Sequence, residues 1–195
     1  RVGLLTGLIG LLLVFIYSLF QYRLLGFVTI ASLVVAGIIS YEAIALLGWA
    51  LNYRLSLAGV AGLIVAIGAT ADSFIVYFER IRDEIRAGRT IPSAVNHGWK
   101  RASRTILASK AVNLLAAVVL YVVSVGSVKG FAFTLGLTAI ADLLVVYLFT
   151  HPALTLLANT RYFGEGHRHS GLSPESLGST PLYRGAGRIR TPEEK

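Results

Sequence analysis

The chain has 195 residues, of which 55% are hydrophobic and 14% are charged, and its mean hydropathy is +0.69. In a soluble domain about a quarter of the residues are charged. The apolar residues here gather in blocks long enough to cross a bilayer. A soluble globular fold is therefore excluded. Cysteine is absent, which excludes disulfides and thiolate metal sites, and the net charge of +8 is expected to face anionic lipids and not nucleic acid.

Five membrane spans are predicted, so the expected fold is an all-α polytopic helix bundle in residues 1–157. The predicted spans cover about residues 2–20, 24–49, 55–78, 105–125 and 131–157. Between the third and fourth spans, residues 79–104 are predicted to form a cytoplasmic amphipathic loop. Residues 158–195 are rich in Gly, Ser, Pro and Arg, which predicts a disordered, basic cytoplasmic tail. Small residues spaced four apart, such as Ala58 and Gly62, favour a compact bundle.

The distribution of Lys and Arg predicts the orientation of these spans. With five spans, fourteen of these residues fall on the side of the 79–104 loop and the tail, and three fall on the other side: Arg1, Arg54 and Lys129. Residue 1 is therefore expected outside the cytoplasmic membrane, and the C-terminus is expected in the cytoplasm. Because the chain begins with Arg and not with Met, we also expect it to be part of a longer protein.

The predicted cytoplasmic loop contains two helical stretches. The first continues the third span as a charged helix with the ion pairs Arg80–Glu84 and Asp83–Arg86, and Gly88 is expected to end it. The second stretch has Pro92 in its first turn and an amphipathic pattern, which predicts a helix that lies along the membrane surface. A solvated linker helix is an equally good interpretation of that second stretch.

Four ionisable residues fall within the predicted spans, at a cost of about 2.5–3.5 kcal/mol each on insertion scales: Glu42, Asp72, Lys110 and Asp142. At 1.5 Å per residue, the last three lie about 8–13 Å inside the predicted cytoplasmic boundary, so they can share one layer. A carboxylate balanced between burial and a neighbouring ammonium can load and release a proton. The pattern fits a proton relay of Asp72, Lys110 and Asp142. For Asp72 a static ion pair that joins helices fits equally well, and for Lys110 and Asp142 the static pair fits better. Glu42 is interpreted as structural or interfacial.

No catalytic residue, metal site or cofactor is predicted. The four histidines have no further ligand at metal-binding spacing, and the motifs of hydrolases, zinc proteases and nucleotide-binding loops do not occur. Membrane-embedded Ser and Thr residues more often bond to helix carbonyls than act as nucleophiles. The sequence therefore gives no support for an enzyme.

Four stretches carry a family likeness: "GATAD" (68–72), "FERIRDEIRAGRT" (78–90), "WKRASRTIL" (99–107) and "VGSVKGFAFTLGL" (125–137). In this order, over about residues 3–157, the chain resembles the SecD/SecF family of protein-export membrane proteins in the RND superfamily. Phe78, Glu79 and Arg80 are more similar to its SecD members than to SecF. The resemblance implies five spans of an RND-type six-span half, without the first span and the large external domain.

The resemblance implies an accessory subunit of the Sec protein translocase. Such a subunit works with SecF, near SecYEG, SecA and the translocating preprotein, and it uses the proton motive force to promote export across the cytoplasmic membrane. Asp72 matches the family's membrane aspartate. Four residues match the cytoplasmic helix, which is expected to couple movement to a partner: Glu79, Arg80, Arg82 and Glu84.

The likeness breaks at three positions. Phe74 and Lys110 stand where the family usually has Asn, and Ala108 stands where it usually has Asp. The resulting hypothesis is that Lys110, which we expect to face Asp72, and Asp142 replace the contacts of the lost residues.

Two other functions remain open. The runner-up is an RND-type half that exports lipid or a small molecule under proton drive, which would carry different external modules and normally both halves in one chain. The third is a scaffold that docks on the translocon without transporting protons. It predicts that apolar replacements of all the buried charges leave export intact.

Overall fold

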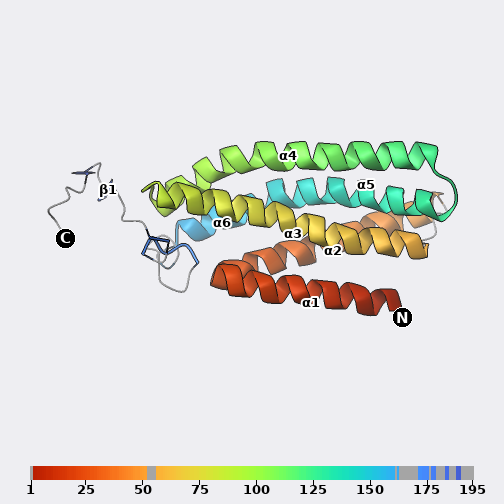
Figure 1. Ribbon diagram of the computed structural model, residues 1–195, viewed down its shortest axis with the longest axis horizontal. Coiled ribbons are helices and arrows are strands. Elements are labelled where there is room, and N and C mark those ends of the chain that lie inside the picture. Colours follow the sequence, from red (N-terminus) through yellow and green to blue (C-terminus); the bar gives the residue numbers. More distant parts are fainter. Residues whose placement is uncertain are drawn as a thin grey trace.

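The computed structural model describes residues 2–51, 56–160, 162, 171–175, 177–178, 183–184 and 188–189, and most of these residues are helical. The elements are α1 (Val2–Tyr22), the 3-10 turn η1 (Arg23–Leu25), α2 (Gly26–Leu51), α3 (Leu57–Arg86), α4 (Ile91–Val123), α5 (Ser127–Val145), the π-helical turn η2 (Val146–Thr150), α6 (His151–Ala158), β1 (Tyr183–Arg184) and β2 (Arg188–Ile189). The two short strands pair antiparallel. Figure 1 shows the long helices aligned along one axis as an elongated bundle, which confirms the predicted all-α fold.

Within the described residues, four helical stretches are long and apolar enough to cross a membrane: Leu5–Leu47, Leu57–Arg86, Ile91–Val123 and Ser127–Ala158. The first of them contains η1, where the chain reverses its direction between α1 and α2 (Figure 1). No long polar segment separates these two helices, so by length and hydropathy they count as one apolar stretch. The predicted number of five spans therefore stays a prediction.

The reversal at η1 depends on two backbone features. Arg23 has a φ of 53°, in the left-handed region that a helix does not use. A Cβ atom on Gly26 would lie 2.8 Å from the carbonyl oxygen of Ser18, so only glycine lets α2 begin this close to the end of α1. Tyr22 and Leu25 are buried on either side of the turn.

A tight elbow joins α3 to α4. Gly88 has a φ of 87° and donates its N–H to the carbonyl of Ile85, while Arg89 donates to the carbonyl of Glu84. These bonds satisfy carbonyls at the end of the helix. The prediction that Gly88 ends this helix is therefore confirmed.

The second helical stretch of the predicted cytoplasmic loop was expected to lie along the membrane surface, and this prediction is wrong. From Ile91 onward the chain forms a single 33-residue helix, α4, which runs antiparallel to α3 (Figure 1). Gly98 allows this close approach, because a Cβ atom there would lie 3.0 Å from the backbone nitrogen of Ile81. Ala94 and Val95 are buried on the same part of α4, so its apolar face packs on protein and not on lipid.

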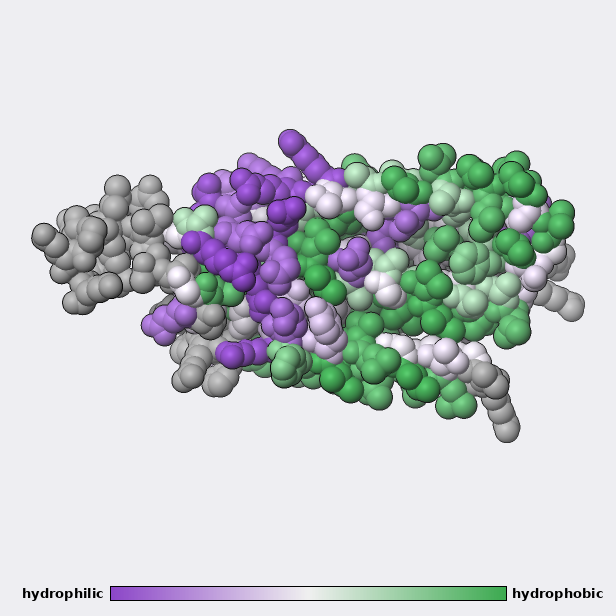
Figure 2. All heavy atoms as spheres, in the orientation of Figure 1, coloured by the Kyte–Doolittle hydropathy of each residue, from purple (hydrophilic) through white to green (hydrophobic). Residues whose placement is uncertain are grey.

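The surface of the bundle divides into two parts (Figure 2). Hydrophilic side chains gather at the end that holds the last turns of α3 and the first turns of α4, and we call this the polar end. Most of the remaining described surface is apolar, with exposed side chains such as Leu8, Val122 and Leu148. This pattern is expected when lipid surrounds the helices.

The tail differs from the predicted disorder at residues 171–175, 177 and 178. Leu172 and Ser173 are buried, and Leu172 belongs to the same hydrophobic core as Tyr22. A turn closes the segment, because Leu177 donates its N–H to the carbonyl of Ser173. The segment packs on the polar end of the bundle.

Candidate functional site

A buried ion pair joins three helices inside the bundle. Lys110 of α4 places its Nζ 2.7 Å from Oδ2 of Asp142 on α5, and both side chains are at most 3% exposed. Lys110 also donates to the carbonyl oxygen of Ala69 on α3 at 2.9 Å. Thr70 donates its hydroxyl to Oδ1 of Asp142 at 2.5 Å. Both carboxylate oxygens are therefore hydrogen-bonded, as a buried charge requires.

Helical spacing explains why these groups meet. On α5, Thr134, Thr138 and Asp142 are four residues apart and form one buried face. On α3, Ala66 and Thr70 are buried with the same spacing. Thr70 was not predicted as a site residue, because the Ala66/Thr70 spacing also indicates simple helix packing.

Asp72 does not join the ion pair, so the expectation that Lys110 faces Asp72 is wrong. Two residues turn an α-helix by about 200°, so Asp72 points away from the side on which Thr70 meets Asp142. Asp72 is exposed, and in the described part of the chain it makes no hydrogen bond or ion pair. Phe74, which stands where the resemblance expects Asn, is fully buried.

A cavity of about 520 Å³ opens beside the ion pair. Residues of α1, α2, α3 and α5 line it, and most of these residues are apolar. Thr70, Thr138 and Asp142 form part of its wall. The carboxylate of the pair therefore borders a space inside the bundle and is not enclosed by close packing on every side.

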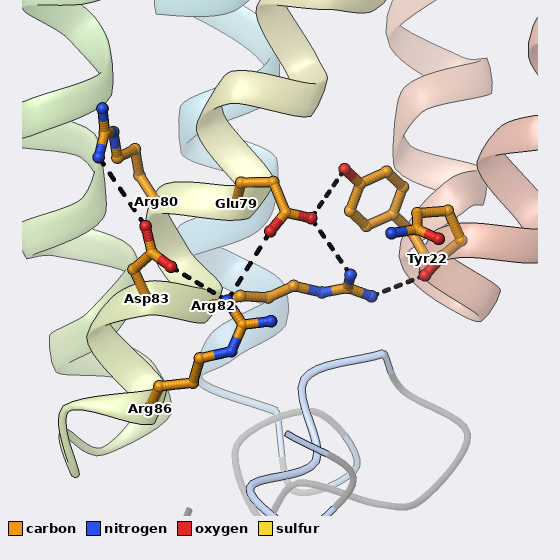
Figure 3. A network of polar contacts seen from close by, with 7 residues as sticks. Tyr22, Glu79, Arg80, Arg82, Asp83 and Arg86 are labelled. Atoms are coloured by element: carbon orange, nitrogen blue, oxygen red, sulfur yellow. Dashed lines mark hydrogen bonds and ion pairs between the residues drawn. The ribbon is translucent and has the colours of Figure 1, made fainter. Parts of the chain in front are cut away.

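The coupling residues predicted from the sequence lie at the polar end, and two of them join α3 to the end of α1 (Figure 3). Oε1 of Glu79 accepts a hydrogen bond from the Tyr22 hydroxyl at 3.1 Å and lies 3.3 Å from Arg82. Arg82 also donates to the carbonyl of Gln21 at 2.7 Å, and its guanidinium lies 4.5 Å from the centre of the Tyr22 ring. We call these four residues the α1–α3 joint.

The other two predicted coupling residues behave differently. Arg80 is exposed and lies 3.8 Å from Asp83, which also pairs with Arg86 at 3.0 Å, so the predicted Asp83–Arg86 pair is confirmed. The predicted Arg80–Glu84 pair is wrong, because Glu84 turns into the α3–α4 elbow. Its buried carboxylate lies 2.6 Å from Arg89 and 3.2 Å from Arg101 of α4.

An aromatic cluster that no sequence pattern indicates joins α3, α4 and α6. The Tyr77 hydroxyl lies 2.8 Å from Nδ1 of His151, and the His151 ring stacks on Trp99 at 4.3 Å. Tyr147 meets the Trp99 ring edge-on at 4.8 Å. Among the residues that the structure describes, no group of three or more His, Asp or Glu could hold a metal ion.

The fold and the buried pair define a multi-pass membrane protein with ionisable groups in its helical interior, a feature that commonly marks ion or proton paths. The chain belongs to the SecD/SecF family, because the family model for "Protein export membrane protein SecD/SecF, C-terminal" matches residues 2–160. The resemblance seen in the sequence motifs is thereby confirmed.

Curated relatives carry the name protein translocase subunit SecD. The Streptomyces coelicolor protein is 54% identical over 98% of this chain and 34% of its own length. The Mycobacterium tuberculosis protein is 51% identical over 97% of this chain and 30% of its own length. The chain thus spans about a third of the length of the relatives that it matches.

Solved structures agree with this assignment. The crystal structure of SecDF from Thermus thermophilus, described as a translocon-associated membrane protein, matches 80% of this chain and 21% of its own chain. The TM-score is 0.73 and the sequence identity is 34%. A second SecDF structure, in a super-membrane-facing form, gives a TM-score of 0.72 at 32% identity.

Proposed function

We propose that this chain forms the membrane part of an accessory subunit of the Sec translocase. With a SecF-type partner, and near SecYEG and SecA, it uses the proton motive force to promote export of the preprotein across the cytoplasmic membrane. Family membership supports the role in export. The observation that carries the proton-driven part is the Lys110–Asp142 pair, which is buried where three helices meet.

Asp72 is the proposed proton-exchanging group of the relay. Lys110 and Asp142 neutralise each other and hold α3 through Ala69 and Thr70, within one helical turn of Asp72. When Asp72 binds a proton, its carboxylate loses its charge and no longer needs a polar environment. α3 can then shift against α4 and α5, and the pair determines how far that shift goes.

The Asp72 side of α3 is the proposed contact with the SecF-type partner. An ionised carboxylate that faces lipid is unfavourable by about 2.5–3.5 kcal/mol on insertion scales. Ala61, Val65 and Gly68 are exposed on the same side at helical spacing. The small residues Ala61 and Gly68 permit a second helix to approach closely and to cover Asp72.

The polar end of the bundle is the proposed cytoplasmic output of the relay. A shift of α3 reaches α1 through Arg82 and reaches α4 through Glu84. Lys100 and Arg104 are exposed on α4 at the same end, where they can bind anionic lipid headgroups. This orientation places the excess of basic residues in the cytoplasm.

The variant Asp72→Asn tests the relay, because the amide keeps the size of the side chain and cannot ionise. We expect this variant to lose the part of preprotein export that depends on the proton motive force, measured in membrane vesicles with and without a protonophore. Glu42→Gln is the matched control, since it removes a carboxylate from the exposed side of α2 and should leave export unchanged.

Unchanged export in Asp72→Asn would contradict the relay. Export that survives Asp72→Asn together with apolar replacement of Lys110 and Asp142 would favour the scaffold function instead.

A further inference from the structure

The packed tail segment, residues 171–175, 177 and 178, presents a buried leucine to the polar end. Leu172 is 1% exposed and shares one hydrophobic core with Tyr22 and Leu25. Leu177 packs against the same core, and Gly178 donates its N–H to the carbonyl of Glu175. The segment is therefore a compact turn with apolar anchors on the bundle.

Gly171 brings the backbone of this segment into direct contact with the end of α1. A Cβ atom there would lie 2.3 Å from the carbonyl oxygen of Tyr22 and 3.7 Å from Cβ of Leu25. Its φ of 82° also requires glycine. Any larger residue at this position would separate the segment from the α1–α2 turn.

The same short stretch of α1 belongs to the α1–α3 joint. Gln21 gives its carbonyl to Arg82, and Tyr22 gives its hydroxyl to Glu79 and its ring face to the Arg82 guanidinium. Residues 21 and 22 therefore lie between the coupling helix and the tail segment.

We propose that the tail segment is a built-in strap that docks on the α1–α2 turn and holds it in the position where Gln21 and Tyr22 bind Arg82 and Glu79. With the strap docked, α1 moves together with α3. With the strap released, the turn loses its apolar cover at Leu25 and α1 separates from the joint. The consequence for export rests on the proposed function, but the docking itself does not.

A single-cysteine reporter tests docking in membranes that contain the intact subunit with any cysteine outside this chain replaced, since the chain itself has none. Leu25→Cys places a thiol at a position that is 0% exposed. Adding Leu172→Asp buries an unpaired charge in the docked strap and should release it. We expect a water-soluble maleimide to label Cys at position 25 about tenfold faster or more in the released form, as local opening predicts.

Glu175→Gln is the matched control, since Glu175 is exposed in the same segment, and it should leave the labelling rate unchanged. Gly171→Val is a second release variant that introduces no charge, and it should raise the rate in the same way. If neither release variant raises the labelling rate above the control, the strap is not docked there and the proposal is overturned.

Export then separates the two levels of the proposal. Faster labelling together with weaker proton-driven export supports the strap as a positioning device for the joint. Faster labelling with unchanged export overturns its role in coupling. If Asp72→Asn leaves export unchanged while the release variants still label faster, the proposed relay is contradicted and the proposed docking of the strap is supported.

Discussion

Lys110 and Asp142 carry opposite charges on side chains that are almost fully buried in the bundle. Moving two charges out of water is expensive, and their attraction repays this cost only when the geometry is good and the remaining hydrogen bonds are made. Here Ala69 and Thr70 make those bonds. The pair therefore determines how α3, α4 and α5 meet, even though its net contribution to stability is small.

The single variant Lys110→Met should destabilise the protein by about 3–5 kcal/mol, because it leaves the Asp142 carboxylate buried without its counter-charge. The double variant Lys110→Met/Asp142→Leu should recover most of that loss, since two apolar side chains of similar volume then fill the site. Denaturant unfolding of the purified protein in detergent measures both values, and the two single variants complete a double-mutant cycle.

A double variant as unstable as the single ones would contradict this account of the pair. It would mean that the pair stabilises the bundle outright and that apolar residues cannot replace it.

The charged residues show what sequence can predict at this scale. Position along a helix follows from counting residues, and Asp72, Lys110 and Asp142 lie inside the long helices α3, α4 and α5. Rotation about the helix axis depends on the neighbours that a helix packs against, and the sequence does not give these. Asp72 and Asp142 therefore looked alike in the sequence, although one is exposed and the other buried.

At the scale of elements, α3 is the central helix of the bundle, because it contacts α1, α2, α4 and α5. Gly62 sets its distance from α5, since a Cβ atom there would lie 2.2 Å from Oγ1 of Thr134 and 3.1 Å from the carbonyl oxygen of Phe131. The side chain of Thr134 can rotate, but the backbone of Phe131 must move. The Ala58/Gly62 spacing thus marks a true close approach of two helices.

Gly62→Val should therefore force α5 away from α3 and destabilise the protein by about 1–3 kcal/mol, the usual cost of overpacking. Gly68→Ala on the same helix is the control, because no atom lies within 4 Å of the added Cβ, and it should stabilise the helix by up to about 1 kcal/mol. Thermal unfolding of both purified variants measures the difference. Equal effects of the two substitutions would show that the helices do not meet at Gly62.

The elements also differ in how far the sequence predicts their ends. Gly88 ends α3 for a local reason, its positive φ, so its role was predictable. The π-helical turn η2 has no local signal within an apolar stretch. The hydroxyl of its Thr150 lies 2.9 Å from that of Ser32 on α2, and a contact between helices so distant in sequence becomes visible only in the folded chain.

At the scale of the whole molecule, composition and motif order were sufficient to predict a membrane bundle of this family. They did not predict the strap, because residues 171–178 have few apolar side chains and a composition that is typical of disorder. Two leucines and a glycine of the segment contact the apolar surface of the α1–α2 turn. Composition averages over a segment, whereas docking depends on individual side chains.

The orientation of the bundle is the remaining prediction at this scale. The polar end carries the basic residues of α3 and those of α4 other than Lys110. Each Lys or Arg near an anionic leaflet is favoured by about 1 kcal/mol. Asn96 is exposed near this end of α4, and Val125 is 84% exposed just beyond the opposite end of the same helix. The two positions therefore lie on opposite sides of any membrane that α4 crosses.

In otherwise cysteine-free protein, Asn96→Cys should react with a membrane-impermeant maleimide in inverted vesicles but not in intact cells, and Val125→Cys should show the reverse. A permeant maleimide is the control, because it should label both variants in both preparations. The opposite pattern would place the α1–α3 joint and the strap outside the cell, and it would contradict the proposed cytoplasmic coupling. Reaction of both variants from the same side would mean that α4 does not cross the membrane.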